Sequence, residues 1–233
     1  MRLDKYLCDT ASLTRNLAKR AIRREEVRVD GHVTRDAAMQ VTEENDVEWL
    51  GQRLVLSGPR YLMMNKPSGI ECTSHSSHYQ TVFELIDLPN VQRLHSAGRL
   101  DVDTTGLVFL TDDGQWSHRV TSPRHACKKV YLATLADPLE GEVAEKVKKA
   151  FAEGVQLKGE NRVTRPASLE LLSPVDARIT IQEGKYHQVR RMFAAFGNHV
   201  EALHRESVGP VSLDPDLAPG ESRMLRQAEI LSF

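Results

Sequence analysis

The sequence predicts an α+β protein in which a small N-terminal α/β module precedes a larger α+β domain. Three observations support this. The chain has 233 residues, a length that suits one or two domains. Apolar runs typical of strands alternate with helical patterns over most of the chain. The pattern changes near residues 57–60. We therefore expect one domain over residues 1–57 and a second over residues 60–233.

The composition excludes several classes of protein. Hydrophobic residues make up 40% of the chain and charged residues 27%, which is ordinary for a globular protein and unlike a disordered or collagen-like chain. No run of about 18 apolar residues occurs, so we expect no membrane-spanning helix. No apolar signal segment follows Met1, so we expect a cytoplasmic location. The cysteines lack metal-ligand spacing, which favours inert thiols at all three positions: Cys8, Cys72 and Cys127.

Basic charge is concentrated at the start of the chain. Residues 1–35 hold nine Lys or Arg and five acidic residues, a net charge of +4, whereas residues 36–58 have a net charge of −4. The whole chain has a net charge of only −1. Exposed charges more than about 10 Å apart are largely screened in physiological salt. The local surplus can therefore attract a polyanion even though the net charge does not.

The first module is expected to begin with two helices. Leu3, Tyr6 and Leu7 indicate a short first helix, and Thr14 is a suitable N-cap for a second helix that ends near residue 24. At 100° per residue, one side of the second helix is apolar: Leu17, Ala18, Ala21 and Ile22. The opposite side is basic: Lys19, Arg20 and Arg23. This helix can pack on a core and still present fixed positive charge.

The rest of the first module is expected to be β-structure. Valines alternate on both sides of Asp30-Gly31, which is typical of a hairpin over residues 27–33. Residues 46–49 could add another strand. Residues 51–59 are interpreted as a connector that leads into the larger domain.

The larger domain mixes strands and helices. Five apolar runs predict strands: residues 61–65, 107–111, 130–135, 167–172 and 177–182. Two helical patterns separate them: residues 140–151 and 188–196. The glycines form neither a dinucleotide-binding nor a P-loop motif, so no nucleotide cofactor is indicated.

The segment of residues 95–114 carries the most chemistry, because a polar, glycine-containing loop there precedes an apolar strand. Asp101, Asp103 and Asp112 partly match a calcium-binding loop, but the closing Glu is missing. The Asp101-x-Asp103-x-Thr105 spacing also occurs in aspartate-based phosphotransferases, but no hydrophobic strand comes directly before Asp101. Both interpretations are therefore weak.

The first module resembles the small RNA-binding fold named after ribosomal small-subunit protein four. The resemblance covers residues 1 to about 50 and rests on the segments 2–7, 14–15 and 27–31. It implies that the basic helix contacts RNA phosphates, through Arg15, Lys19, Arg20 and Arg23. Such contacts supply salt-sensitive affinity and little sequence discrimination.

The larger domain resembles the RNA pseudouridine synthases. Four of its segments match that family's motifs in order and spacing: residues 65–69, 98–107, 129–131 and 183–192. The resemblance implies a mixed, largely antiparallel sheet flanked by helices, and isomerisation of a flipped-out uridine without cofactor or metal. The layout as a whole is similar to the subfamily that acts on small-subunit (16S) ribosomal RNA.

The resemblance assigns roles to three residues of this sequence. Asp101 becomes the carboxylate that acts as nucleophile and then handles a proton. Arg190 becomes its basic partner, which keeps the carboxylate ionised and oriented. Tyr131 becomes the aromatic face beneath the flipped base, which offsets part of the cost of unstacking.

Further contacts with RNA are expected around this site. Lys66 and Lys129 lie in the matching motifs and are expected to contact RNA, although Lys66 is equally compatible with shaping a loop. Arg99 could fill the gap left by the flipped base or bind a phosphate. Residues 114–136 contain no Asp or Glu and predict part of an RNA-binding rim. The expected partner is ribosomal RNA in an assembling small subunit, bound by a monomer. Two alternatives stay open, namely action on large-subunit RNA and a non-catalytic role in ribosome assembly.

Overall fold

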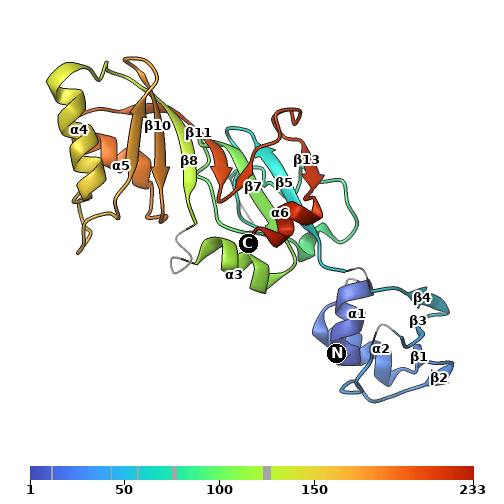
Figure 1. Cartoon of the computed structure of the whole chain (residues 1–233). Coiled ribbons are helices and arrows are strands. Elements are labelled where there is room, and N and C mark those ends of the chain that lie inside the picture. Colours follow the sequence, from blue (N-terminus) through green and yellow to red (C-terminus); the bar gives the residue numbers. More distant parts are fainter. Residues whose placement is uncertain (12, 43, 57, 75–77, 123–126) are drawn as a thin grey trace. The chain divides into compact units, whose positions relative to one another are not determined.

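The computed structural model describes residues 1–233 except 12, 43, 57, 75–77 and 123–126. The chain forms two compact units, Met1–Pro59 and Arg60–Phe233, each with its own sheet and core (Figure 1). Within the described residues, no helix combines the length and apolar character needed to cross a membrane.

The first unit packs two helices on a small antiparallel sheet. The helices are α1 (Leu3–Ala11) and α2 (Arg15–Arg23). The sheet has the order β2-β1-β3-β4 and consists of β1 (Val27–Val29), β2 (His32–Val33), β3 (Val47–Trp49) and β4 (Gln52–Leu54). The core draws on both layers, and its fully buried members include Leu3, Leu7, Ile22, Val27 and Val47.

Helix α2 begins where the sequence predicts. The Thr14 hydroxyl accepts a hydrogen bond from the Leu17 amide at 3.3 Å, which caps the helix. Ala18, Ala21 and Ile22 are buried as expected. Leu17 is a correction: its side chain is 45% exposed, because this nine-residue helix packs only along its Ala18–Ile22 edge.

Two tight turns shape the small sheet. Asp30 and Gly31 both have positive φ angles, of 51° and 78°, which suit the two-residue turn of the predicted hairpin. Leu50 and Gly51 repeat this conformation at 52° and 78° and join β3 to β4. The interpretation of residues 51–59 as a connector is therefore wrong for the part that forms β4.

The second unit is built on a nine-stranded mixed sheet of order β13-β5-β7-β11-β8-β10-β9, with β12 and β6 attached to β11 and β7. Its strands are β5 (Tyr61–Lys66), β6 (His95–Ser96), β7 (Thr105–Thr111), β8 (Lys129–Leu135), β9 (Ser168–Leu171), β10 (Asp176–Ile181), β11 (Val200–Val208), β12 (Val211–Ser212) and β13 (Ser222–Met224). Among the described strands, β7 and β11 pair in parallel and the other pairs are antiparallel. The predicted mixed, largely antiparallel sheet is confirmed.

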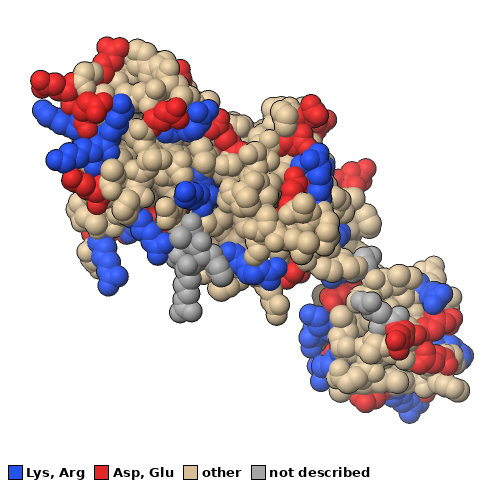
Figure 2. Space-filling model, in the orientation of Figure 1, with Lys and Arg blue, Asp and Glu red and all other residues tan. Residues whose placement is uncertain are grey.

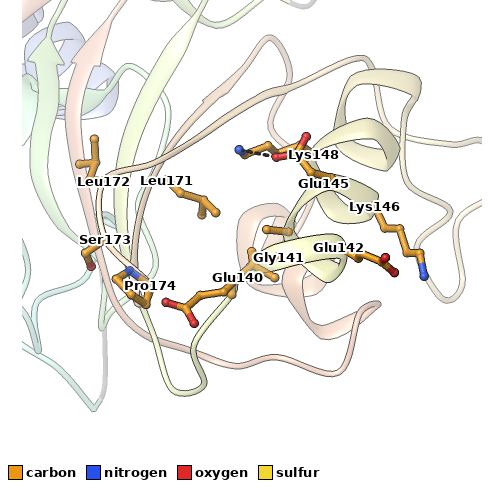
Figure 3. A pocket seen from close by; sticks show the side chains of 12 residues that line it. Glu140, Gly141, Glu142, Glu145, Lys146, Lys148, Leu171, Leu172, Ser173 and Pro174 are labelled. Atoms are coloured by element: carbon orange, nitrogen blue, oxygen red, sulfur yellow. Dashed lines mark hydrogen bonds and ion pairs between the residues drawn. The ribbon is translucent and has the colours of Figure 1, made fainter.

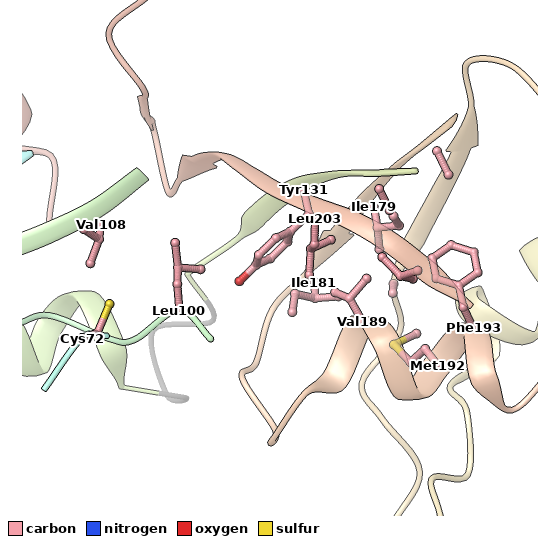
Figure 4. Close-up of a cluster of buried hydrophobic side chains, with 14 of the residues drawn as sticks. Cys72, Leu100, Val108, Tyr131, Ile179, Ile181, Val189, Met192, Phe193 and Leu203 are labelled. Atoms are coloured by element: carbon pink, nitrogen blue, oxygen red, sulfur yellow. The ribbon is translucent and has the colours of Figure 1, made fainter. Parts of the chain in front are cut away.

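Helices cover this sheet on both sides. They are α3 (Gly114–Thr121), α4 (Gly141–Glu153), α5 (Gln188–Ala194) and α6 (Gln227–Leu231), with a short 3₁₀ helix at Val91–Arg93. Alternate residues of β5 and β7 point to opposite sides. Met64 and Val108 join the core cluster that also includes residues of α4 and α5, whereas Met63 and Phe109 join the cluster that includes residues of α3 and α6. Figure 4 shows part of the first core, from Val108 to Phe193.

Strand β11 was not predicted, although it lies at the centre of the sheet between β7 and β8. Four of its nine residues are charged or histidine, so its sequence does not have the apolar run expected of a central strand. At Gly106, an added Cβ would lie 2.4 Å from the backbone oxygen of Arg205. The glycine therefore allows β7 to approach β11 and fixes the surroundings of the loop before β7.

Candidate active site

Asp101 lies in the turn that leads into β7. The turn is closed by a hydrogen bond from the Thr104 amide to the Asp101 carbonyl at 3.1 Å, and the neighbouring Leu100 side chain is buried in the core. The Asp101 side chain itself stays 34% exposed. A carboxylate anchored in this way, and still open on one side, can meet a base that has left its stack.

The turn is braced by the segment of residues 65–69. The Val102 carbonyl accepts hydrogen bonds from the Gly69 amide at 2.8 Å and from the Lys66 ammonium at 3.1 Å. Lys66 also donates to the carbonyls of Ile70 at 2.7 Å and Pro67 at 3.0 Å. The lysine is fully buried, and this burial lowers its pKa. The donors of Lys66 serve the backbone of the turn, which favours the loop-shaping role over a contact with RNA.

His187 is the side chain that meets Asp101 directly. Its Nε2 lies 3.4 Å from Oδ1 of Asp101, an ion pair when the imidazole is protonated. His187 has a positive φ of 46° just before α5, a conformation that non-glycine residues adopt at a cost. The Tyr186 ring stacks on the imidazole, with ring centroids 3.8 Å apart. Sequence reasoning assigned His187 no functional role; its position inside the last motif was the signal available.

Arg190 reaches the same loop at a different carboxylate. Its Nη2 lies 2.9 Å from Oδ2 of Asp103, and its Nη1 donates to the Val200 carbonyl. The expected partner was Asp101, and the structure differs because the turn directs Asp103 toward α5. The guanidinium is only 16% exposed, and its Nε and Nη2 atoms donate no well-aligned hydrogen bond to any described residue. Nη2 is thus ion-paired with Asp103, and both atoms are closed off from solvent.

Tyr131 lies next to a buried arginine. Arg205 on β11 stands opposite Tyr131 on β8, and its Nη1 lies 3.5 Å from the tyrosine hydroxyl. Its Nε donates to the Leu107 carbonyl at 2.7 Å. In Figure 4 the Tyr131 hydroxyl is directed toward Leu100, the neighbour of Asp101. Sequence reasoning missed Arg205, because β11 itself was not predicted.

The remaining expected contacts of the second unit lie on the surface or serve the backbone. Arg99, two residues before Asp101, is exposed. Lys129 donates to the Cys127 carbonyl at 3.2 Å, and burial lowers its pKa. In the predicted rim over residues 114–136, Arg124 and His125 lie outside the described residues.

The first unit presents the predicted basic side chains on α2. Arg15, Arg20 and Arg23 are exposed, and Lys19 is half-buried. The Arg15 guanidinium pairs with the fully buried Asp4, with Nη1 3.6 Å from Oδ2. Figure 2 shows blue Lys and Arg side chains along the left border of this unit, whereas blue and red side chains are mixed on its right and lower borders.

Other features of the second unit stand apart from Asp101. A cavity of about 850 Å³ lies between α4 and the loop that joins β9 to β10 (Figure 3), and none of the predicted site residues lines it. Within the described part of the chain, no group of three or more His, Cys, Asp or Glu side chains could hold a metal ion. The three cysteines are free, and burial raises the pKa of each thiol.

Comparison with known proteins agrees with the order of the two units along the chain. Residues 60–195 match the family described as RNA pseudouridylate synthase, and residues 1–47 match the S4 domain. The chain is 51% identical to the ribosomal small subunit pseudouridine synthase A of Vibrio cholerae and 52% identical to that of Escherichia coli K12, over 233 residues that cover 100% of this chain and 99% of each relative.

A solved structure extends the comparison to three dimensions. A crystal structure of a pseudouridylate synthase superposes with a TM-score of 0.71 at 48% identity, covering 100% of this chain and 99% of the other. The similarity therefore includes both the S4 unit and the unit that carries Asp101. The chain belongs to the RNA pseudouridylate synthase family.

Proposed function

We propose that this chain converts one uridine of small-subunit (16S) ribosomal RNA to pseudouridine, with Asp101 as the reacting carboxylate. The observation that carries the proposal is the Asp101 carboxylate, which is 34% exposed in an anchored turn within the region that matches the RNA pseudouridylate synthase family. The choice of RNA rests on relatives at 51% and 52% identity, which are named for the small ribosomal subunit.

The reaction requires little beyond a well-placed carboxylate. The bond between uracil N1 and ribose C1′ breaks, the base turns, and C5 joins C1′; C5 then loses a proton and N1 gains one. Asp101 can attack C1′, attack the uracil ring or assist elimination, and each route needs an ionised carboxylate within reach of the base. The Nε2 atom of His187 lies 3.4 Å from Oδ1 of Asp101 and can help to orient the carboxylate.

Tyr131 and Arg190 complete the proposed site. Tyr131 is only 7% exposed, and its hydroxyl lies 3.5 Å from Nη1 of Arg205 and is directed toward Leu100, the neighbour of Asp101. Its ring offers the flat apolar surface that a base loses when it leaves the RNA stack. Arg190 is ion-paired with Asp103 in the loop that carries Asp101, and it is proposed to position this loop.

Capture of the RNA is proposed to use the basic face of α2. Arg15, Lys19, Arg20 and Arg23 provide charges that can contact phosphates, and Arg99 adds an exposed guanidinium next to Asp101. Phosphate contacts position a nucleic acid without reading its sequence. We therefore assign affinity to the S4 unit and choice of the uridine to the surroundings of Asp101.

Replacing the carboxylate tests the proposal. Asp101→Asn should abolish pseudouridine formation in 16S ribosomal RNA while changing RNA affinity by no more than a few-fold, since the amide has the same shape but cannot act as a nucleophile. Asp216→Asn, at an exposed carboxylate of the same unit, is the matched control and should keep full activity. Normal turnover by Asp101→Asn would remove Asp101 from the mechanism.

Mapping of the product decides the substrate. Wild-type chain incubated with small-subunit RNA, large-subunit RNA and small-subunit assembly intermediates should yield one new pseudouridine in the small-subunit samples. A product in large-subunit RNA alone would reassign the substrate. No product in any sample, together with tight RNA binding, would instead indicate a non-catalytic assembly factor.

A further inference from the structure

Tyr186 is an aromatic side chain with an unusual position. It is 74% exposed, the most exposed of the large hydrophobic side chains described in the structure. A single exposed aromatic residue is normal on a protein surface and needs no explanation by itself. What distinguishes Tyr186 is its neighbour, because its ring stacks on His187, which in turn reaches Asp101.

The geometry of the pair resembles stacked bases. The two rings lie with centroids 3.8 Å apart and an interplanar angle of 18°. His187 therefore has its Nε2 edge toward Asp101 and one face covered by Tyr186. Because Tyr186 is largely exposed, the face of its ring that points away from His187 is open to a third ring.

The turn that carries Tyr186 is fixed by hydrogen bonds and ion pairs. The Tyr186 carbonyl accepts a hydrogen bond from Arg191 at 3.0 Å, and Arg191 also pairs with Glu160 at 3.0 Å. Lys185 pairs with the same Glu160 at 2.9 Å, and its amide donates to the Gln188 side chain at 2.9 Å. An exposed ring on a fixed backbone loses little conformational entropy when a ligand stacks on it.

We propose that Tyr186 and His187 form a stacking platform for a nucleobase next to the target uridine. The inference rests on the proposed function and extends it to a second nucleotide. A base on the open face of Tyr186 is separated from Asp101 by the imidazole, so it is a neighbour of the reacting uridine and not the uridine itself. Stacking on an aromatic side chain tolerates any base, so the platform adds affinity and register without reading sequence.

Binding of a generic RNA tests the platform without turnover. Tyr186→Ala should weaken the binding of a short fluorescent oligouridylate by roughly five- to a hundredfold, the range measured for loss of one stacked base. Tyr186→Phe keeps the ring and should bind within twofold of wild type. Leu231→Ala, at another exposed apolar side chain of this unit that is 73% exposed, is the matched control and should bind normally.

Kinetics with the natural substrate locate the stacked base. On the RNA fragment that contains the modified uridine, Tyr186→Ala should raise KM and leave kcat at saturating RNA within a few-fold of wild type. An abasic residue placed at one position beside the uridine should impose the same penalty on the wild type, and no further penalty on Tyr186→Ala.

The outcomes separate the two proposals. If the wild type forms no pseudouridine, the proposed function fails, and the oligouridylate titration still decides whether the platform exists. If the wild type is active and Tyr186→Ala binds oligouridylate as tightly as wild type, the platform is overturned. Abasic penalties that are equal in the wild type and in Tyr186→Ala at every flanking position would also overturn it.

Discussion

Gly106 lies against the backbone of Arg205, where β7 and β11 run in parallel. Its φ is +98°, and an added Cβ would approach the Arg205 oxygen to 2.4 Å. Gly106→Ala should therefore lower the free energy of unfolding by about 2–5 kcal/mol, through strain and overpacking. Gly114→Ala is the control, because no atom lies within 4 Å of its added Cβ. Urea denaturation of both variants measures the difference; equal stabilities would contradict the close approach.

Lys66 separates a structural role from a role in binding RNA. Lys66→Met keeps the length of the side chain but leaves the carbonyls of Pro67, Ile70 and Val102 without their shared donor. We expect a loss of about 1–3 kcal/mol in stability and a lower kcat, because the turn of Asp101 loosens. RNA affinity should stay within twofold of wild type; weaker RNA binding by Lys66→Met would restore the lysine as a contact.

The exposed Arg99 is the matched comparison. Arg99→Ala removes a charge without removing a hydrogen bond to the turn, so it should weaken RNA binding and leave stability unchanged.

For single residues, the sequence indicates which residues belong to the candidate site better than it indicates which side chains they contact. Asp101, Tyr131 and Arg190 can be selected from motif order, and Asp101 lies in a turn that leaves its side chain 34% exposed. The pairing of Arg190 with Asp103 and the approach of His187 to Asp101 depend on the direction of one turn and on a positive φ at residue 187. Neither feature leaves a pattern in the sequence.

Helix α6 is held in place by one ionic cluster. Glu229 accepts hydrogen bonds from Arg223 at 2.7 and 2.9 Å, and these lower its pKa to about 2 from an ordinary value of 4.5. A carboxyl with a lowered pKa in the folded state stabilises the fold above its unfolded pKa and loses this contribution as pH falls. The cluster should therefore contribute up to about 3 kcal/mol at neutral pH and progressively less between pH 4.5 and 2.

A pair of variants measures this contribution. Glu229→Gln should lower Tm at pH 7, and the difference from wild type should shrink as the pH falls below 4.5. Glu153→Gln removes a carboxylate from a surface pair that is 66% exposed and should change Tm little at either pH. A pH-independent difference for Glu229→Gln would show that packing of α6, and not the charge, holds it.

Among the elements, strands with ordinary apolar runs were predicted and β11 was not. The predicted strand over residues 130–135 corresponds to β8, and the predicted helix over 140–151 corresponds to α4. In contrast, β11 carries Glu201, His204, Arg205 and Glu206 at the centre of the sheet, because Arg205 finds hydrogen-bond partners inside it. The short β4 could have been predicted from the Leu50-Gly51 turn, which repeats the geometry of Asp30-Gly31.

For the whole molecule, the separate cores of the two units predict two separable activities. The chain without its first unit, residues 60–233, should fold, and should reach a normal kcat at saturating RNA with a raised KM. The slope of log affinity against log salt should become shallower by up to about 3, because as many as four phosphate contacts are lost. Steady-state kinetics at two salt concentrations measure both effects; unchanged KM and salt dependence would give the first unit another role.

The order of these units could be predicted from charge and motif order, because each unit uses its own segment of the sequence. The change of pattern near residues 57–60 and the basic surplus of residues 1–35 both survive in the folded structure, as a division after Pro59 and as the exposed side chains of α2. How the nine strands are ordered could not be predicted, because β11 enters the sheet between two strands that precede it in the chain.

That insertion has a consequence for when the protein becomes active. A ribosome that has synthesised the chain as far as α5 has already made the turn of Asp101 and the ring of Tyr131, but Arg205 and the strand that joins β7 to β8 are still to come. Contacts between segments so distant in sequence form late, because closing a long loop costs entropy before the new contacts repay it. We therefore expect the chain to become active only after β11 has been translated. A nascent chain that stalls before this strand should not modify ribosomal RNA.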